Sequence, residues 1–135
     1  MRKIMIAAAV LGFAASTVIW AEPGLTAQGP EVKRTVLMQH DTPDGKYQNS
    51  LVMVEIPVGG REGRHNHPGP LIVYVEQGTI TLEYEGKPTT PYKAGETFFV
   101  EAGKTHQGIN MGTVPAKAVA SFVTEKGKPL TTQTE

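Results

Sequence analysis

Hydrophobic and polar residues alternate over short stretches through most of the chain. The stretches expected to form strands are 32–39, 51–58, 71–77, 79–84, 97–100, 105–110 and 116–124. Most of them are rich in β-branched, aromatic and aliphatic residues, which is typical of strands. Turn residues separate several of them, for instance at 41–45, 77–78 and 85–87. No helical period is evident after residue 21. Short strands with turns between them predict an all-β sandwich or barrel.

The same pattern yields a first set of expected core residues. On a strand, alternate side chains share a face, so one face of each strand should be buried. The residues expected to pack in the core are Leu51, Met53 and Val58 of the second strand, together with the aromatic Tyr74, Phe98, Phe99 and Phe122.

The N-terminal residues resemble an export signal. Arg2 and Lys3 precede an apolar run over 4–20 that ends near Ala21, which is the secretory pattern. We therefore expect a signal helix over 1–21, cleaved after Ala21 or Ser16, and a periplasmic or secreted protein. The alternative is an uncleaved anchor, although the run is shorter than the roughly 20 residues of a typical span.

The remaining chain divides into a linker at 22–31, a domain at 32–125 and a polar, flexible tail at 126–135. There is no cysteine, which excludes disulfides. The chain has 13 basic and 13 acidic residues. Cleavage would remove Arg2 and Lys3, leaving 11 basic against 13 acidic residues and a net charge of −2. With no basic stripe, this charge argues against a nucleic-acid partner.

Three of the four histidines suggest a metal site. His65 and His67 are two residues apart, so on an extended segment their side chains point to the same side. His106 follows about 40 residues later, and a barrel could bring it beside them. Neutral imidazole is a ligand for Zn, Fe, Mn, Ni and Cu. The alternative for the pair alone is two solvated loop histidines, as we expect for His40.

Glycines and other residues around these histidines resemble the two cupin motifs. The first motif, G-x5-H-x-H-x3-E-x6-G, matches from Gly59 to Gly78, and the second, G-x5-P-x-G-x2-H-x3-N, matches from Gly95 to Asn110. Eight of the ten defining positions agree with the spacing intact. The departures are Glu101 in place of a turn proline and Leu71 in place of an acidic metal ligand.

The resemblance implies a single cupin jelly-roll β-barrel. It implies that His65, His67 and His106 bind one divalent transition metal, with iron foremost and Mn, Zn, Ni or Cu as alternatives. The lost glutamate leaves a neutral three-histidine set, or a degenerate site without metal. Asn110 would brace a turn. Because histidine must be neutral to bind metal and its reference pKa is about 6.5, acidification should weaken binding.

Three functions follow from the resemblance. The first is a dioxygenase-like enzyme acting on a small organic molecule, and the second is a non-catalytic binding or sensing module with weak or no metal. The third, an isomerase or hydrolase using metal-bound water, is weakened because no general base is evident within the motifs. Arg64 could attract an anionic ligand or lie on the surface. We expect no stable membrane span after cleavage, and a homodimer formed through an edge strand.

Overall fold

The structure is a computed structural model that describes residues 29–135. The expected signal helix, and all but the end of the expected linker, lie outside the described residues. Within 29–135 the secondary structure consists entirely of strands, and no helix there could cross a membrane. The strands are β1 (Lys33–Asp41), β2 (Tyr47–Ile56), β3 (His65–Asn66), β4 (Leu71–Gln77), β5 (Thr79–Tyr84), β6 (Lys87–Lys93), β7 (Thr97–Val100), β8 (His106–Ile109), β9 (Ala116–Glu125) and β10 (Thr132–Gln133).

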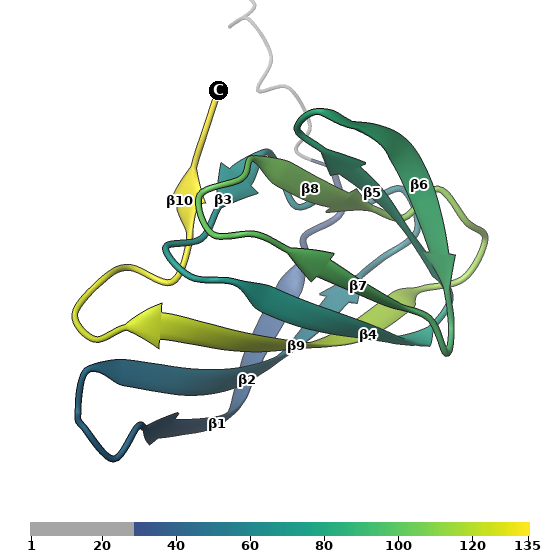
Figure 1. Ribbon diagram of the computed structural model, residues 1–135. Helices are drawn as coiled ribbons and strands as arrows, with labels where there is room; N and C mark the ends of the chain where they lie inside the picture. Colours follow the sequence, from purple (N-terminus) through teal and green to yellow (C-terminus); the bar gives the residue numbers. More distant parts are fainter. Residues whose placement is uncertain (1–28) are drawn as a thin grey trace, which may run out of the picture.

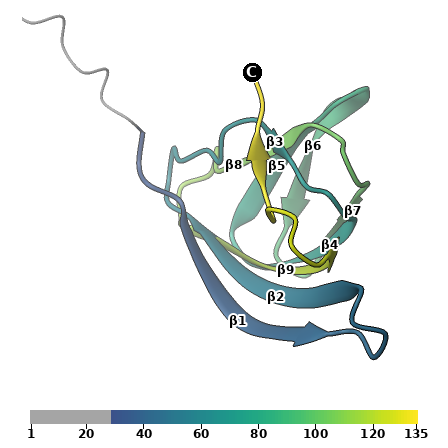
Figure 2. The same cartoon turned by 90° about the vertical axis from the view of Figure 1, so that its left-hand side faces the viewer.

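Two antiparallel five-stranded sheets form the molecule (Figure 1). One sheet has the order β1-β2-β9-β4-β7 and the other the order β10-β3-β8-β5-β6. Seen from the side, the strands curl around a common interior, and β1 lies at the outer edge beyond β2 (Figure 2). The all-β prediction is confirmed for the described residues.

The core fills the space between the two sheets. Its members are aliphatic residues of β2, β4, β5 and β7, alanines of β9, and two aromatic side chains: Val52, Val54, Ile56, Leu71, Val73, Val75, Ile80, Leu82, Tyr84, Val100, Ala116, Ala118, Ala120 and Phe122. The small alanines of β9 occupy the centre of the first sheet, which leaves room in the interior for other side chains.

The expected core of β2 was assigned to the wrong face. Leu51 is exposed and Met53 is half buried, whereas Val52, Val54 and Ile56 are buried. Val58 was expected in the same strand, but it lies beyond the end of β2 and is exposed. Residues 51–54 are all apolar, so the pattern marks a strand without distinguishing its two faces. A shift of one residue then exchanges the faces completely.

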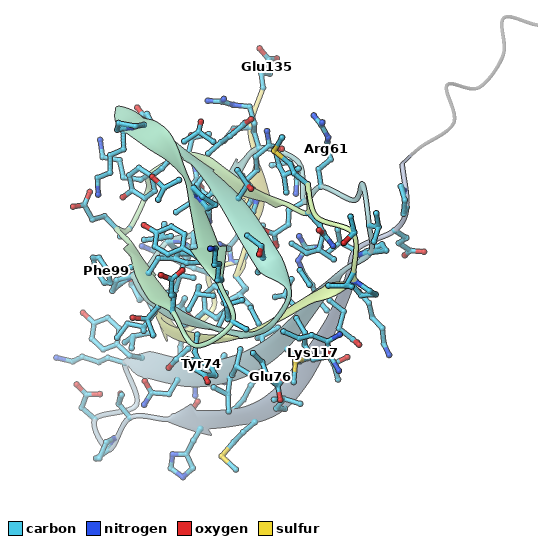
Figure 3. All side chains as sticks on the ribbon, turned by 90° about the vertical axis from the view of Figure 1, so that its right-hand side faces the viewer. Arg61, Tyr74, Glu76, Phe99, Lys117 and Glu135 are labelled. Atoms are coloured by element: carbon cyan, nitrogen blue, oxygen red, sulfur yellow. The ribbon has the colours of Figure 1, made fainter. Side chains whose placement is uncertain are left out.

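Two of the four aromatic residues expected in the core lie outside it. Phe122 is buried and Phe98 packs against the core, as predicted. Tyr74 and Phe99 are 48% and 52% exposed, on the outer side of β4 and β7 (Figure 3). Each alternates with an inward-facing neighbour, which explains the error.

Strand β6 was not expected from the sequence because its seven residues include two prolines. It pairs only with β5 and forms one edge of its sheet. Proline is tolerated on an edge strand because the missing N–H leaves no ladder bond unmade.

Candidate metal centre

The three histidines of the motifs lie together inside the barrel. His65 is in β3 and is the register partner of His106 in β8, which places their side chains side by side. His67 follows β3 directly. All three are buried, with exposed fractions of 2%, 4% and 5% for His65, His67 and His106. His40 is exposed on β1 and takes no part in the cluster, as expected.

The rings are close enough to share one ion. Their centroids are 4.8 Å apart for His65 and His67, 4.4 Å for His65 and His106, and 5.1 Å for His67 and His106. One ligand atom from each residue lies within 4.8 Å of the others. Nitrogens bound to one zinc ion at about 2.1 Å can be at most roughly 4.2 Å apart. Slight inward ring rotation would therefore bring all three into range.

Hydrogen bonds orient the three imidazoles. Each Nδ1 lies against a backbone carbonyl oxygen, which can only accept, so each Nδ1 must carry the proton. The neutral ring then has its lone pair on Nε2, free to bind a metal. The pairs are His65 with Gly63 at 2.7 Å, His67 with Leu130 at 2.7 Å, and His106 with Lys104 at 2.9 Å.

Burial favours the neutral form of His67 and His106. The pKa of His67 is lowered from 6.5 to about 4, mainly by burial and also by the neighbouring charges of His65, His106 and Arg34. The hydrogen bond to the Leu130 carbonyl opposes this shift. Burial also lowers the pKa of His106, against the opposing influence of the Lys104 carbonyl and of the Glu62 charge. A neutral, oriented imidazole is the form that binds a divalent transition metal, so the residues present fit such an ion.

The acidic ligand of the resembled motif has no replacement in this cluster. Leu71 is buried and lines a cavity that the three histidines also line. Among the described residues, the group able to hold one ion consists of the three histidines alone. Three neutral ligands would leave the charge of a divalent ion uncompensated by its ligands, which favours anionic or readily deprotonated ligands in the open positions.

Glycines allow the loops around the cluster to approach closely. The N–H of Gly103, at a φ of 75°, donates to the His67 carbonyl at 2.8 Å and so joins the loops that carry His67 and His106. A Cβ on Gly69 would lie 1.8 Å from the Val123 carbonyl oxygen, so no other residue fits there without a backbone shift.

Asn110 braces the end of β8, as expected. It is fully buried, donates to the carbonyls of Ile56 and Val114, and accepts from the N–H of Gly112. These bonds tie β8, which carries His106, to the end of β2.

The C-terminal residues are part of the site, which the expectation of a polar tail did not foresee. Strand β10 pairs with β3 beside His65, and Leu130 is half buried against the core. Leu130 supplies the carbonyl that orients His67, and Thr131 lines the cavity. The sequence signal was a single leucine in a polar segment, too little to predict a contact more than 60 residues away.

A cavity opens beside the histidines. Its walls are mostly aliphatic and aromatic core residues, and its polar lining consists of the histidines, Arg34, Glu62 and Thr131. The cavity is small, with a volume of ≈ 60 Å³. Arg64, considered above as an anion-binding residue, lines a separate surface depression.

Glu62 and Arg34 are functional candidates that sequence reasoning missed. Sequence reasoning found no general base within the motifs and passed over Glu62, a carboxylate that stands between Gly59 and His65 of the first motif and faces the cavity. Arg34 is on β1, 28 residues earlier, and no spacing rule connects it to the site. Its guanidinium donates to Glu62 at 3.1 Å.

Comparison with known proteins identifies the family. Residues 52–122 match the cupin domain family. The match covers more than half of the chain, and the chain belongs to this family. No curated protein sequence matches it.

Solved structures share the fold at low sequence identity. The polyketide cyclase RemF from Streptomyces resistomycificus is 20% identical, with a TM-score of 0.63 over 93% of this chain and 87% of the cyclase. An uncharacterized protein with a double-stranded β-helix domain from Klebsiella pneumoniae is 18% identical, with a TM-score of 0.61 over 83% of this chain and 89% of the other. An oxalate oxidase in complex with glycolate is 24% identical, with a TM-score of 0.61 over 80% of this chain and 56% of the oxidase.

Proposed function

We propose that this cupin is an exported, metal-dependent enzyme that uses dioxygen on a small organic molecule. The observation that carries the proposal is the convergence of three buried imidazoles, each oriented by a carbonyl so that Nε2 is free. His65, His67 and His106 would hold one divalent transition metal, with iron foremost and Mn, Zn, Ni or Cu as alternatives. Such an ion would supply open coordination positions and a redox-active or Lewis-acid centre.

The chain's own residues define what could react there. The mostly apolar walls lower the local dielectric constant, which strengthens electrostatic interactions at the site. The cavity admits a ligand of few heavy atoms. This size favours small thiols over larger catechols and flavonols, unless the mouth of the barrel opens. Two structural neighbours, the oxalate oxidase and the polyketide cyclase, are enzymes by name, which supports catalysis on this fold.

A non-catalytic binding or sensing cupin is the alternative. The observation that favours it is Leu71 at the position of the acidic ligand, which leaves the metal with neutral ligands only. Lower affinity for metal would follow, and the apolar cavity would then be a ligand site with or without an ion.

Metal content tests the proposed site. Protein isolated from a periplasmic extract should contain close to one equivalent of metal per chain, and His106→Ala should lose at least about 10-fold in metal affinity. His40→Ala is the matched control, because His40 is exposed on β1 and outside the cluster. Metal retained by His106→Ala would contradict the site.

Oxygen consumption then separates an enzyme from a binder. Iron-loaded protein should consume dioxygen in the presence of one member of a panel of small thiols, catechols and flavonols, and His106→Ala should not. Saturable ligand binding without oxygen uptake across the panel would support the binding module instead.

Export remains a proposal that rests on residues 1–21. Expression of the full chain in a bacterium, followed by mass spectrometry of the periplasmic fraction, should give a mature N-terminus at Glu22 or Thr17. Full-length protein retained in the membrane fraction would support the anchor alternative.

A further inference from the structure

Glu62 is the only carboxylate among the described residues that line the histidine cavity. It lies in the segment between β2 and β3, and its side chain is 14% exposed. Its backbone N–H donates to the Gly108 carbonyl at 3.0 Å, which fixes its position along β8. Glu62 lies outside the group of three histidines whose ligand atoms are close enough to share one ion.

Two donors hold the carboxylate in place. Oε2 accepts the backbone N–H of Gly108 at 3.0 Å, and Oε1 accepts the guanidinium of Arg34 at 3.1 Å. Arg34 pairs with the buried Val54 across the β1–β2 ladder, so it belongs to the inward face of the sheet. A carboxylate accepts about four hydrogen bonds, so Glu62 has capacity for two more from a ligand.

The backbone of β8 is shaped to admit this side chain. A Cβ on Gly108 would lie 2.8 Å from Glu62 Oε2, 3.2 Å from Ile80 and 3.3 Å from Ile56. Only glycine at this position lets the carboxylate lie over the strand. Gly108 is two residues from His106, and the charge of Glu62 influences the pKa of that histidine. The carboxylate therefore lies close enough to His106 to act on it electrostatically.

We infer that Glu62 selects the ligand of this site: the cavity takes small molecules that bind the metal at one end and present a hydroxyl hydrogen-bond donor at the other, in preference to carboxylates. The inference rests on the proposed metal site. A hydroxyl can donate to the free lone pairs of Glu62, whereas an ionised carboxylate has no proton to donate and leaves these lone pairs unpaired. Arg34 acts as a positioning residue, because its guanidinium donates to Oε1 and so holds the carboxylate in place.

Two thiols of nearly equal size test the selection. Mercaptoethanol and mercaptoacetate both offer sulfur to the metal and differ at the far end, a hydroxyl against a carboxylate. Their dissociation constants are measured on cobalt-loaded protein through the cobalt–thiolate absorption. Compared with wild type, Glu62→Gln should weaken the binding of mercaptoethanol relative to that of mercaptoacetate by about 10-fold or more. This is the affinity expected to be lost with one charge-assisted hydrogen bond.

Two further variants complete the experiment. Gly108→Ala keeps the carboxylate but displaces it, and should shift the ratio in the same direction. Glu55→Gln is the control, because Glu55 also pairs with cations, Lys33 and Lys117, but on the outer face. A ratio unchanged by both Glu62→Gln and Gly108→Ala, on protein that binds cobalt, overturns the inference alone. Failure of wild type to bind cobalt overturns the proposed metal site and the inference with it.

Discussion

At the scale of single residues, His67 couples folding to pH. Its pKa is lowered from 6.5 to about 4 by burial in the folded protein. Below pH 6.5 the unfolded chain therefore binds a proton at this residue that the folded chain does not bind. Stability rises with pH wherever the unfolded state binds more protons. The contribution of His67 to the free energy of unfolding is thus complete above pH 6.5 and is lost as the pH falls toward 4.

This sign gives a measurable prediction for the metal-free protein. Between pH 7 and pH 5, His67 should lower the free energy of unfolding by about 2 kcal/mol. Urea unfolding of wild type and His67→Gln at both pH values isolates the effect, because the variant lacks the titrating ring. His40→Gln, at an exposed site, should behave as wild type does. Equal pH dependence in wild type and His67→Gln would show that burial does not shift this pKa.

The same shifts modify the expected pH dependence of metal binding. For imidazoles with the reference pKa of 6.5, protons would compete with the metal ion from neutral pH downward. The lowered pKa values of His67 and His106 move proton competition at these two nitrogens to lower pH. Acidification still weakens binding, but a buried ligand set tolerates more acid than solvated histidines would.

At the scale of elements, the short strand β10 and the two residues before it contribute more contacts to the site than their length suggests. Leu130 and Thr131 follow directly on the loop after β9, and β10 pairs with β3 through only two residues. The fully buried members of the core lie in β2, β4, β5, β7 and β9, and Leu130 is the one residue of this segment that packs against them. The C-terminal segment can therefore be altered without dismantling the fold.

Removal of residues 130–135 should weaken metal binding while the barrel remains folded. The truncation deletes the carbonyl that orients His67, and loss of such a hydrogen-bond partner typically costs 10- to 100-fold in metal affinity. Leu130→Ala is the matched control, since it shortens the side chain but keeps the carbonyl. Metal titration and thermal melting monitored by circular dichroism would check both. A truncated chain with wild-type affinity would show that His67 needs no such support.

At the scale of the whole molecule, β1 is exposed along nearly its whole length. It forms one edge of the first sheet, and its central residues Val36, Leu37 and Met38 are 54%, 48% and 66% exposed (Figure 2). A long edge strand with unpaired backbone groups and apolar side chains is a template for pairing with another chain. We expect a second copy of this chain to pair there, giving a homodimer.

Light scattering after size-exclusion chromatography tests the dimer. Wild type should elute as a dimer, and Met38→Lys should weaken association by at least about 10-fold, because a charge on an edge strand blocks pairing. Met111→Lys is the control, since Met111 is 74% exposed in the loop after β8. Monomeric wild type, or a dimer unaffected by Met38→Lys, would exclude pairing through β1.

The sequence by itself determined the fold class, the family and the three histidines. Alternating apolar positions specify strands, and glycine spacing specifies the turns, since both act over a few residues. Only the tertiary structure decided which face of β2 is buried, that β6 exists, and that Leu130, Arg34 and Glu62 belong to the site. These features depend on pairing between segments far apart in the chain: β1 with β2, the segment before β3 with β8, and the C-terminus with β3. Local pattern carries no information about such contacts until the two sheets close around a shared interior.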